Sequence, residues 1–446
     1  MPRPKAGEQP RRFHGGYHDA ADFDVLANHL EVPSELVVVY EMFPDAFADG
    51  DLDLPESGNG IPDILDEAEW CLMAFLELQL PNGAVPMGRS NLQDSLLQIL
   101  VEGYHPNKKD HNAVTPYGIL PPDWFSTPFF AATAAQYSRA IRKFDAAKAD
   151  RYLAAAEKAF AYASTHTREQ VWQEYSTPEY KMWKPGERKD KSLNWQEGAW
   201  TNVCVWAAGE LLRTTGKADY AKYVQAHPQS KELYWSFHAT SMRIPWAIAN
   251  AEKADAALRE RYRTILAGAP AAGKLLQKSS ETPYRAYVWG GGWWGSLQGI
   301  QNSSDVVRSI ALTGDQQFTD LLSLSIDWHL GCNPIAQSFI TGLGYRYPRR
   351  PEISHFLYEF PEQDLGGKTV KGISLYGIGG GWRDTWGGWP PVRVWRDVWD
   401  NMAEVNSEFT INQTLTPAAV TYAALYALEK KAGRIPPGSK PNPLDH

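Results

Sequence analysis

Two carboxylates near the start of the chain, Asp19 and Asp22, follow the glycine pair Gly15 and Gly16. A spacing of three residues turns both side chains to the same side of a helical turn or a tight loop. Two carboxylates placed in this way can hold one water molecule and remove its proton, as a general base does in a hydrolase. The same residue types also suit a helix start, where a carboxylate caps exposed N–H groups, so the spacing alone leaves both interpretations open.

A third carboxylate, Glu408, precedes the last helical pattern of the chain. An isolated glutamate is most often a solvated surface residue. Here the neighbours include Trp399, Phe409 and Ile411, and apolar neighbours that exclude water let a carboxyl group act as a proton donor near neutral pH. An acid and a base about 6.5–9.5 Å apart, with a water molecule between them, are typical of a glycosidase that inverts the anomeric configuration.

Aromatic residues are numerous, with 18 Trp and 21 Tyr among 446 residues. Some of them must fill the core, but flat rings also stack on the apolar faces of sugars while the indole N–H stays hydrated. Two groups of Trp stand among glycines and are candidates for lining a binding cleft. The first group is Trp289, Trp293 and Trp294, and the second is Trp382, Trp386, Trp389 and Trp395.

The sequence contains no residue pattern typical of a zinc site. We interpret His18 and His238 as structural or substrate-contacting residues rather than as metal ligands. The acidic segment 51–57, together with Asp45, offers the oxygen ligands of a structural calcium site, although a solvated acidic loop has the same composition. Acid–base hydrolysis by carboxylates requires no cofactor.

The net charge of −8 argues against a nucleic-acid partner, which requires clustered Lys and Arg. No apolar run is long enough to cross a membrane. Residues 1–14 resemble a linker and lack the apolar segment of a signal peptide. The cysteines Cys71, Cys204 and Cys332 are far apart, and we expect them to be buried, unreactive thiols within helices.

Helical periodicity dominates the chain, and the alternation typical of strands is nearly absent. Near the carboxyl end, Thr416 is the expected N-cap and Pro417 the first residue of the last helix. The expected helices are 63–78, 128–143, 149–165, 198–214, 241–250, 254–267, 302–312, 315–329 and 416–431.

Four long segments rich in Gly, Pro and Trp separate these helices: 81–127, 170–197, 283–301 and 341–395. Long aromatic loops are usually functional. The pattern predicts an all-α fold, an α/α barrel whose loops form an active-site cleft. We expect one catalytic domain, 15–433, between a linker-like tail, 1–14, and a C-terminal tail, 434–446.

Several blocks, in order along nearly the whole chain, resemble glycoside hydrolase family 9, the inverting cellulase family with an (α/α)6 barrel. The blocks are GGYHDAAD at 15–22, NGIPDILDEA at 59–68, FAATAAQ at 130–136, GCNPIAQSFITG at 331–342 and NSE at 406–408. The resemblance implies that Asp22 is the general base, that Asp19 helps to hold the attacking water, and that Glu408 protonates the glycosidic oxygen. It also implies secretion or an extracytoplasmic location, and an upstream immunoglobulin-like module such as relatives often carry.

Three positions depart from the family pattern. Ala21 stands where the family has Gly, the segment 349–355 lacks the family's two adjacent histidines, and Gln413 replaces an aromatic residue five positions after the catalytic Glu. Arg349 and His355 are candidates to replace the missing histidines. The remaining candidate sugar contacts beside the Trp groups are Tyr17, His18 and Gln413.

The most direct interpretation is an endoglucanase-like enzyme that cleaves β-1,4-glucosidic bonds in cellulose or related β-glucans. A changed binding subsite also fits an exo-acting β-glucosidase or exo-β-glucosaminidase on short oligosaccharides. A non-catalytic carbohydrate-binding protein is the alternative of another class. The size of the products separates the first two, and turnover separates both from the third.

Overall fold

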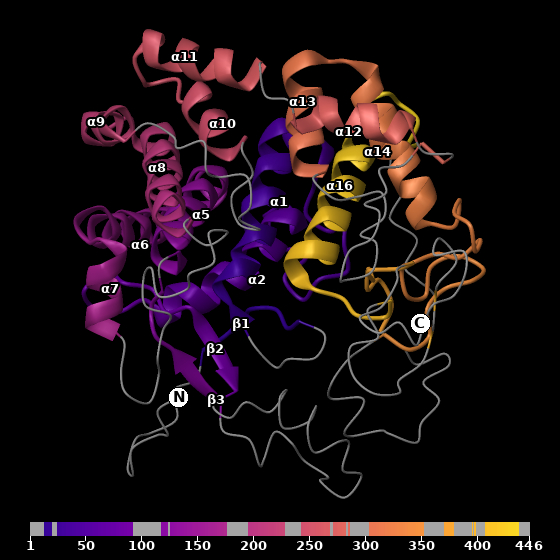
Figure 1. Ribbon diagram of the computed structural model, residues 1–446, viewed down its shortest axis with the longest axis horizontal. Helices are drawn as coiled ribbons and strands as arrows, with labels where there is room; N and C mark the ends of the chain where they lie inside the picture. The colour runs from indigo at the N-terminus through magenta and orange to yellow at the C-terminus, as the bar shows by residue number, and fades with distance from the viewer. Residues whose placement is uncertain are drawn as a thin grey trace, which may run out of the picture. The chain divides into compact units, whose positions relative to one another are not determined.

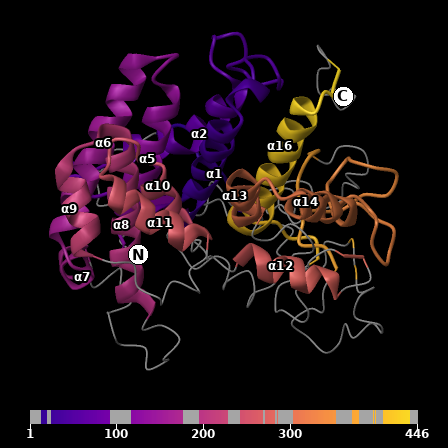
Figure 2. The same cartoon turned by 90° about the horizontal axis from the view of Figure 1, so that it is seen from above.

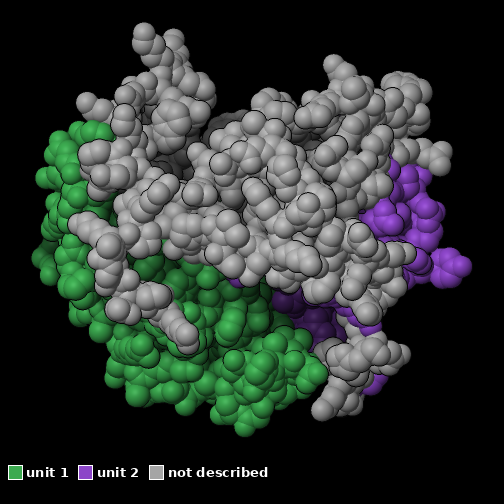
Figure 3. All heavy atoms as spheres, turned by 90° about the horizontal axis from the view of Figure 1, so that it is seen from below, with its two compact units in different colours: residues 1–17, 25–90, 118–269 green, residues 18–24, 91–117, 270–446 purple. Residues whose placement is uncertain are grey.

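The fold is described from a computed structural model (Figure 1). The structure describes residues 13–19, 25–91, 117–123, 125–175, 195–227, 242–267, 271–281, 284–285, 303–351, 370–378, 395, 397 and 406–436. The chain divides into two compact units, coloured separately in Figure 3. Unit 1 comprises 1–17, 25–90 and 118–269, and unit 2 comprises 18–24, 91–117 and 270–446.

Unit 1 is built mainly from helices. They are α1 (Glu31–Met42), α2 (Asp63–Leu78), α5 (Ser126–Ile141), α6 (Ala146–Thr165), α7 (Arg168–Tyr175), α8 (Trp195–Thr215), α9 (Ala218–Ala226), α10 (Arg243–Ala249) and α11 (Ala256–Ala267). Helix α5 packs against α6 and α8, which lie beside it in Figures 1 and 2. Almost every side chain of α5 is buried, and its alanines allow neighbouring helices to approach closely.

Helix α1 was not expected from the sequence. Three consecutive valines, Val37 to Val39, favour a strand, and Pro33 interrupts a helical pattern. Tertiary packing decides the outcome, because α1 is buried along most of its length against α2 and α5. Its buried Glu35 accepts a hydrogen bond from the Arg243 guanidinium Nε of α10 at 2.8 Å.

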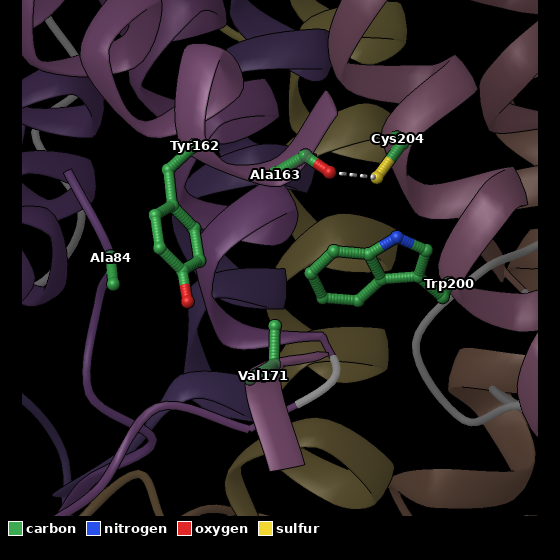
Figure 4. Packing of buried hydrophobic residues seen from close by; sticks show 6 residues of the cluster. All are labelled: Ala84, Tyr162, Ala163, Val171, Trp200 and Cys204. Carbon is green, nitrogen blue, oxygen red and sulfur yellow. Dashed lines mark hydrogen bonds between the residues drawn. The ribbon is translucent and has the colours of Figure 1, made fainter. Parts of the chain in front are cut away.

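A second part of the unit 1 core surrounds Trp200. It comprises the buried residues Ala84, Tyr162, Ala163, Val171, Trp200 and Cys204. In Figure 4 the thiol of Cys204 is directed at the carbonyl oxygen of Ala163, 3.9 Å away. Cys71 is also buried, as predicted. Cys332 was predicted wrongly, because it is exposed and follows the end of a helix.

The strands form one small sheet of order β1–β2–β3: β1 (Val25–Leu26), β2 (Gly88–Asn91) and β3 (Tyr117–Leu120). β1 and β2 are antiparallel, with Val25 opposite Arg89. Gly88 has a φ of 137°, and a Cβ there would lie 1.8 Å from the carbonyl oxygen of Val25, so only glycine fits. Among the described residues, the prediction of a mainly helical fold is confirmed.

Unit 2 contains α12 (Ala271–Ser280), α13 (Ser303–Thr313), α14 (Gln316–His329) and α16 (Thr416–Lys431). Helices α13, α14 and α16 pack on one another, and α12 packs on α13 and α14. A π-helical turn, Ile411–Leu415, leads into α16. Thr416 is the first residue of the helix rather than its N-cap, and its hydroxyl donates to the Ile411 carbonyl at 2.7 Å. No helix in the described parts of the chain is both long and apolar enough to cross a membrane.

Candidate active site

Extended segments of unit 2 hold Glu408 in place. Ile340 and Ser374 form an antiparallel bridge, and the Leu375 N–H donates to the carbonyl of Phe339 at 3.0 Å. On the other side of the same segment, the Tyr376 N–H donates to the Glu408 carbonyl at 3.0 Å. The backbone of Glu408 is therefore paired with that of Tyr376.

The neighbours of Glu408 fix it further. The Phe409 side chain is buried against Leu375, with Trp395 and Leu415 packed around them. Glu408 itself is half-buried, and its Oε2 atom is inaccessible to solvent. Ile411 is also buried. Phe409 and Ile411 are thus both buried, but the predicted contact of apolar side chains with the Glu408 carboxyl group stays a prediction, and Trp399 lies outside the described residues.

Asp19 reaches the turn that follows Glu408. Its Oδ1 accepts a hydrogen bond from the backbone N–H of Ile411 at 2.7 Å, although the two residues are 392 positions apart. Ile411 begins the π-helical turn, and the first N–H groups of a helical segment favour a negative charge. Asp19 therefore caps a helical turn, as its residue type suggested. The turn belongs to a segment far from Asp19 in the sequence and begins three residues after Glu408.

The π-helical turn has a local cause. The Leu415 N–H donates to the Thr410 carbonyl at 3.1 Å, five residues back. Pro417 lies in the first turn of α16 and has no N–H, so it cannot donate the regular α-helical hydrogen bond to the carbonyl four residues before it. Thr410 closes the turn, because its Oγ1 accepts from the Gln413 N–H at 3.2 Å. Single π turns of this kind often occur at functional sites.

Sequence reasoning missed Tyr376. Its buried hydroxyl donates to Oε1 of Gln413 and lies 3.1 Å from Oγ1 of Thr410. Burial raises the pKa of the Tyr376 phenol, and the negative charges of Glu408 and then Asp19 raise it further. The Tyr376 phenol therefore stays protonated near neutral pH and can donate its hydrogen. No local spacing could identify it, because Gln413 is 37 residues away in sequence.

A buried histidine supports the segment that carries Tyr376. His329, at the end of α14, has Nε2 3.1 Å from Oγ of Ser374 and Nδ1 3.3 Å from the hydroxyl of Tyr422 in α16. Burial lowers the pKa of His329 to about 4. The imidazole is therefore neutral near pH 7 and links two helices to the extended segment two residues before Tyr376.

The other described candidates have different surroundings. The carboxylate of Asp397 accepts the backbone N–H groups of Arg349 and Arg350 at 2.9 and 2.8 Å, which anchors the loop after α14. In unit 1, the Tyr17 hydroxyl donates to the Glu67 carboxylate at 2.6 Å, and burial, followed by the charge of Glu67, raises its pKa. His18 is exposed in unit 2.

Several predicted site residues lie outside the residues that the structure describes, and their contacts stay predictions. They are the proposed base Asp22, the tryptophans Trp289, Trp293, Trp294, Trp382, Trp386 and Trp389, and the histidines His238 and His355.

The acidic loop before α2 uses its carboxylates to hold its own backbone. Asp49 accepts the N–H groups of Gly58 and Gly60 at 2.5 and 2.6 Å, and Asp63 accepts those of Gly50 and Leu52 at 2.9 and 2.5 Å. The described parts of the chain contain no group of three His, Cys, Asp or Glu residues arranged to hold a metal ion. Calcium binding by segment 51–57 stays a prediction.

Comparisons with known proteins bear on this site. Residues 4–362 match glycosyl hydrolase family 9. Endoglucanase C of Cellulomonas fimi is 28% identical over 353 residues, which cover 74% of this chain and 30% of that protein. The cellulose 1,4-β-cellobiosidase of Acetivibrio thermocellus is 26% identical over 377 residues, which cover 76% of this chain and 40% of that protein. This chain therefore spans less than half the length of these two relatives.

A solved structure is similar over more of the chain. The crystal structure of a metagenome-derived glycoside hydrolase family 9 endoglucanase has a TM-score of 0.70 and 25% identity, and the match covers 92% of this chain and 70% of that one. The solved relatives have an (α/α)6 barrel, which confirms the predicted fold class. Since the family match covers residues 4–362, which are most of the chain, the chain belongs to glycosyl hydrolase family 9.

Proposed function

We propose that the chain is an inverting glycoside hydrolase that cuts β-1,4-glucosidic bonds within cellulose or a related β-glucan. The observation that carries the proposal is the contact between Asp19 and the turn three residues after Glu408. It joins a carboxylate from one end of the sequence to the segment that carries Glu408, the residue we propose as proton donor. The endoglucanase relative supports the same activity.

In this reaction Asp22 removes a proton from a water molecule that Asp19 helps to hold. The water oxygen attacks the anomeric carbon while Glu408 gives its proton to the departing glycosidic oxygen. One bond forms, one breaks, and the product has the inverted, α configuration. The chemistry uses carboxylates and water alone, so we propose that the enzyme requires no cofactor.

Exo action is the second candidate. The cellobiosidase relative supports it, as do Gln413 and the altered segment 349–355, because a changed subsite can shorten a cleft. In either case the partner is a β-glucan chain or oligosaccharide. We propose one catalytic domain over residues 15–433 and an extracytoplasmic location, where insoluble polysaccharide is accessible.

Hydrolysis of a soluble mixed-linkage β-glucan, with sized products and anomers followed by NMR, tests the proposal. Endo action predicts a fast fall in viscosity, and inversion predicts that the products appear first as the α-anomer. Release of only short sugars from one end of cello-oligosaccharides would support exo action instead. Appearance of the β-anomer first would contradict inversion. A Glu408→Gln variant shows whether the activity belongs to this chain.

A further inference from the structure

Three residues beside the proposed acid, Thr410, Tyr376 and Gln413, form a closed ring of hydrogen bonds. The backbone N–H of Gln413 donates to Oγ1 of Thr410, the hydroxyl of Thr410 lies 3.1 Å from that of Tyr376, and Tyr376 donates to Oε1 of Gln413. When Thr410 donates to Tyr376, the ring runs head to tail and uses every hydroxyl hydrogen. Tyr376 has a single hydroxyl hydrogen, which it donates to Gln413, so Tyr376 accepts from Thr410 rather than donating to it.

This ring fixes which end of the Gln413 amide is which. Oε1 is committed to Tyr376, so the NH2 group points away from it with two hydrogens to donate. Gln413 is half-buried, and no acceptor among the described residues takes a hydrogen bond from its Nε2. The ring therefore presents an oriented hydrogen-bond donor at a partly accessible position.

The donor stands close to both proposed reaction partners. Gln413 is two residues after Ile411, whose N–H binds Asp19. Its partner Tyr376 is paired through the backbone with Glu408. A sugar ring placed between Asp19 and Glu408 for hydrolysis would present its hydroxyl oxygens, which are good acceptors, within reach of this turn.

We propose that Gln413 determines substrate recognition by donating a hydrogen bond from Nε2 to a hydroxyl of the sugar at the cleaved bond, and that Tyr376 is the positioning residue that fixes the amide. This rests on the proposed hydrolysis of β-glucans. Gln413 replaces an aromatic residue of the family pattern. In place of stacking by that aromatic side chain, the Gln413 amide supplies a hydrogen bond to a neutral hydroxyl of the sugar. The preferred ligand is a sugar with a free hydroxyl at that position.

Steady-state kinetics on cellotetraose, with melting temperatures for every variant, test this inference. Gln413→Leu removes the donor and should lower kcat/KM about tenfold, because one hydrogen bond to a neutral partner is lost. Tyr376→Phe keeps the aromatic side chain but removes the hydroxyl that fixes the Gln413 amide, so we expect kcat/KM to fall about three- to fivefold. The double variant should lose no more than Gln413→Leu alone, since Tyr376 acts only through Gln413.

Two further variants separate positioning from general structural damage. Thr410→Val breaks the ring of hydrogen bonds at another point and should lower kcat/KM about as much as Tyr376→Phe. Thr410→Ser keeps the hydroxyl and should have a kcat/KM close to that of the wild type. Tyr162→Phe is the matched control, because it removes a buried tyrosine hydroxyl that binds Glu174 in unit 1, and it should leave kcat/KM unchanged.

Additive losses in the double variant, or an unchanged kcat/KM for Gln413→Leu, would overturn the inference while the hydrolase assignment stands. A wild-type chain that cleaves neither cellotetraose nor soluble β-glucan would overturn the proposed function and this inference together.

Discussion

The hydroxyl of Ser374 lies 3.1 Å from Nε2 of His329, a histidine that is only 2% exposed and whose pKa is lowered to about 4 by burial. The unfolded chain binds this proton with an ordinary pKa of 6.5, so protonation favours unfolding. The contribution of His329 to stability is complete above about pH 6.5 and is lost as the pH falls toward 4.

We therefore expect His329→Gln to flatten the acid side of the stability curve. Between pH 7 and pH 4 the wild type should lose about 3 kcal/mol of unfolding free energy more than the variant. Urea unfolding at pH 7, 5 and 4 measures this difference. Parallel losses in both proteins would show that His329 is not the titrating group.

Asp19 has two separable roles, as a cap and as a charge. Asp19→Asn retains an oxygen that can accept from Ile411 but removes the charge, so we expect kcat/KM to fall at least about 100-fold with little change in melting temperature. Asp19→Ala should also lose about 1 kcal/mol of stability with the cap.

Asp145 provides the matched control, because it caps α6 in unit 1 by accepting from the Lys148 N–H at 2.8 Å and is not among the proposed site residues. Asp145→Ala should cost similar stability and no turnover. Wild-type kcat/KM in Asp19→Asn would show that Asp19 has only a structural role.

Glu408 and Asp22 should respond differently to the leaving group. Glu408→Gln removes the proton donor, so activity on cello-oligosaccharides should fall about 1,000-fold, whereas an aryl cellobioside with an acidic phenol needs little protonation and should be cleaved comparatively well. Asp22→Asn removes the base and should be inactive on both substrates while still binding sugar. Equal losses of Glu408→Gln on both substrates would contradict its role as the acid.

Arg243 should be among the most sensitive positions in unit 1. It is 1% exposed, contacts Glu31 and Glu35 of α1, and stacks its guanidinium carbon 5.3 Å from the ring of Trp206. Arg243→Met leaves two buried carboxylates without their cation, which should cost about 3–5 kcal/mol. Chemical denaturation measures this.

Arg142→Met is the matched control for that substitution. Arg142 binds Asp150 at the surface at 2.8 Å, where solvent screens the pair, so its loss should leave stability almost unchanged. Equal effects of the two substitutions would show that burial of the α1–α10 ion pairs contributes little.

The sequence predicted those helices whose periodicity and terminal residues are marked in the local sequence. The helix at 63–78 was predicted with its observed bounds, because apolar residues recur at a spacing of three and four and Pro62 stands directly before it. The helix at 416–431 was located by Pro417 in its first turn, although Thr416 was expected to be its N-cap. Helix α1 was missed because its valines favour a strand until α2 and α5 bury them. Helices α7, α9 and α12 were missed because they are short, with eight, nine and ten residues.

At the site, the carboxylates Asp19, Asp22 and Glu408 could be selected as candidates because their residue types and their family blocks are local, and their catalytic roles stay predictions. The Tyr376–Gln413 contact could not, because it depends on backbone pairing between 375–377 and 406–408. For the same reason the sequence identified Gln413 as a departure but not its partner.

The hydrogen bond between Asp19 and Ile411 also has a consequence for the order of folding. It closes a loop of 392 residues, whereas α5 with α6 and α13 with α14 are pairs of neighbouring segments of the chain. Contacts between such distant positions carry a large entropy of closure and form late. After dilution from denaturant, helical circular dichroism should recover first, and activity should return only when the two ends of the sequence have met.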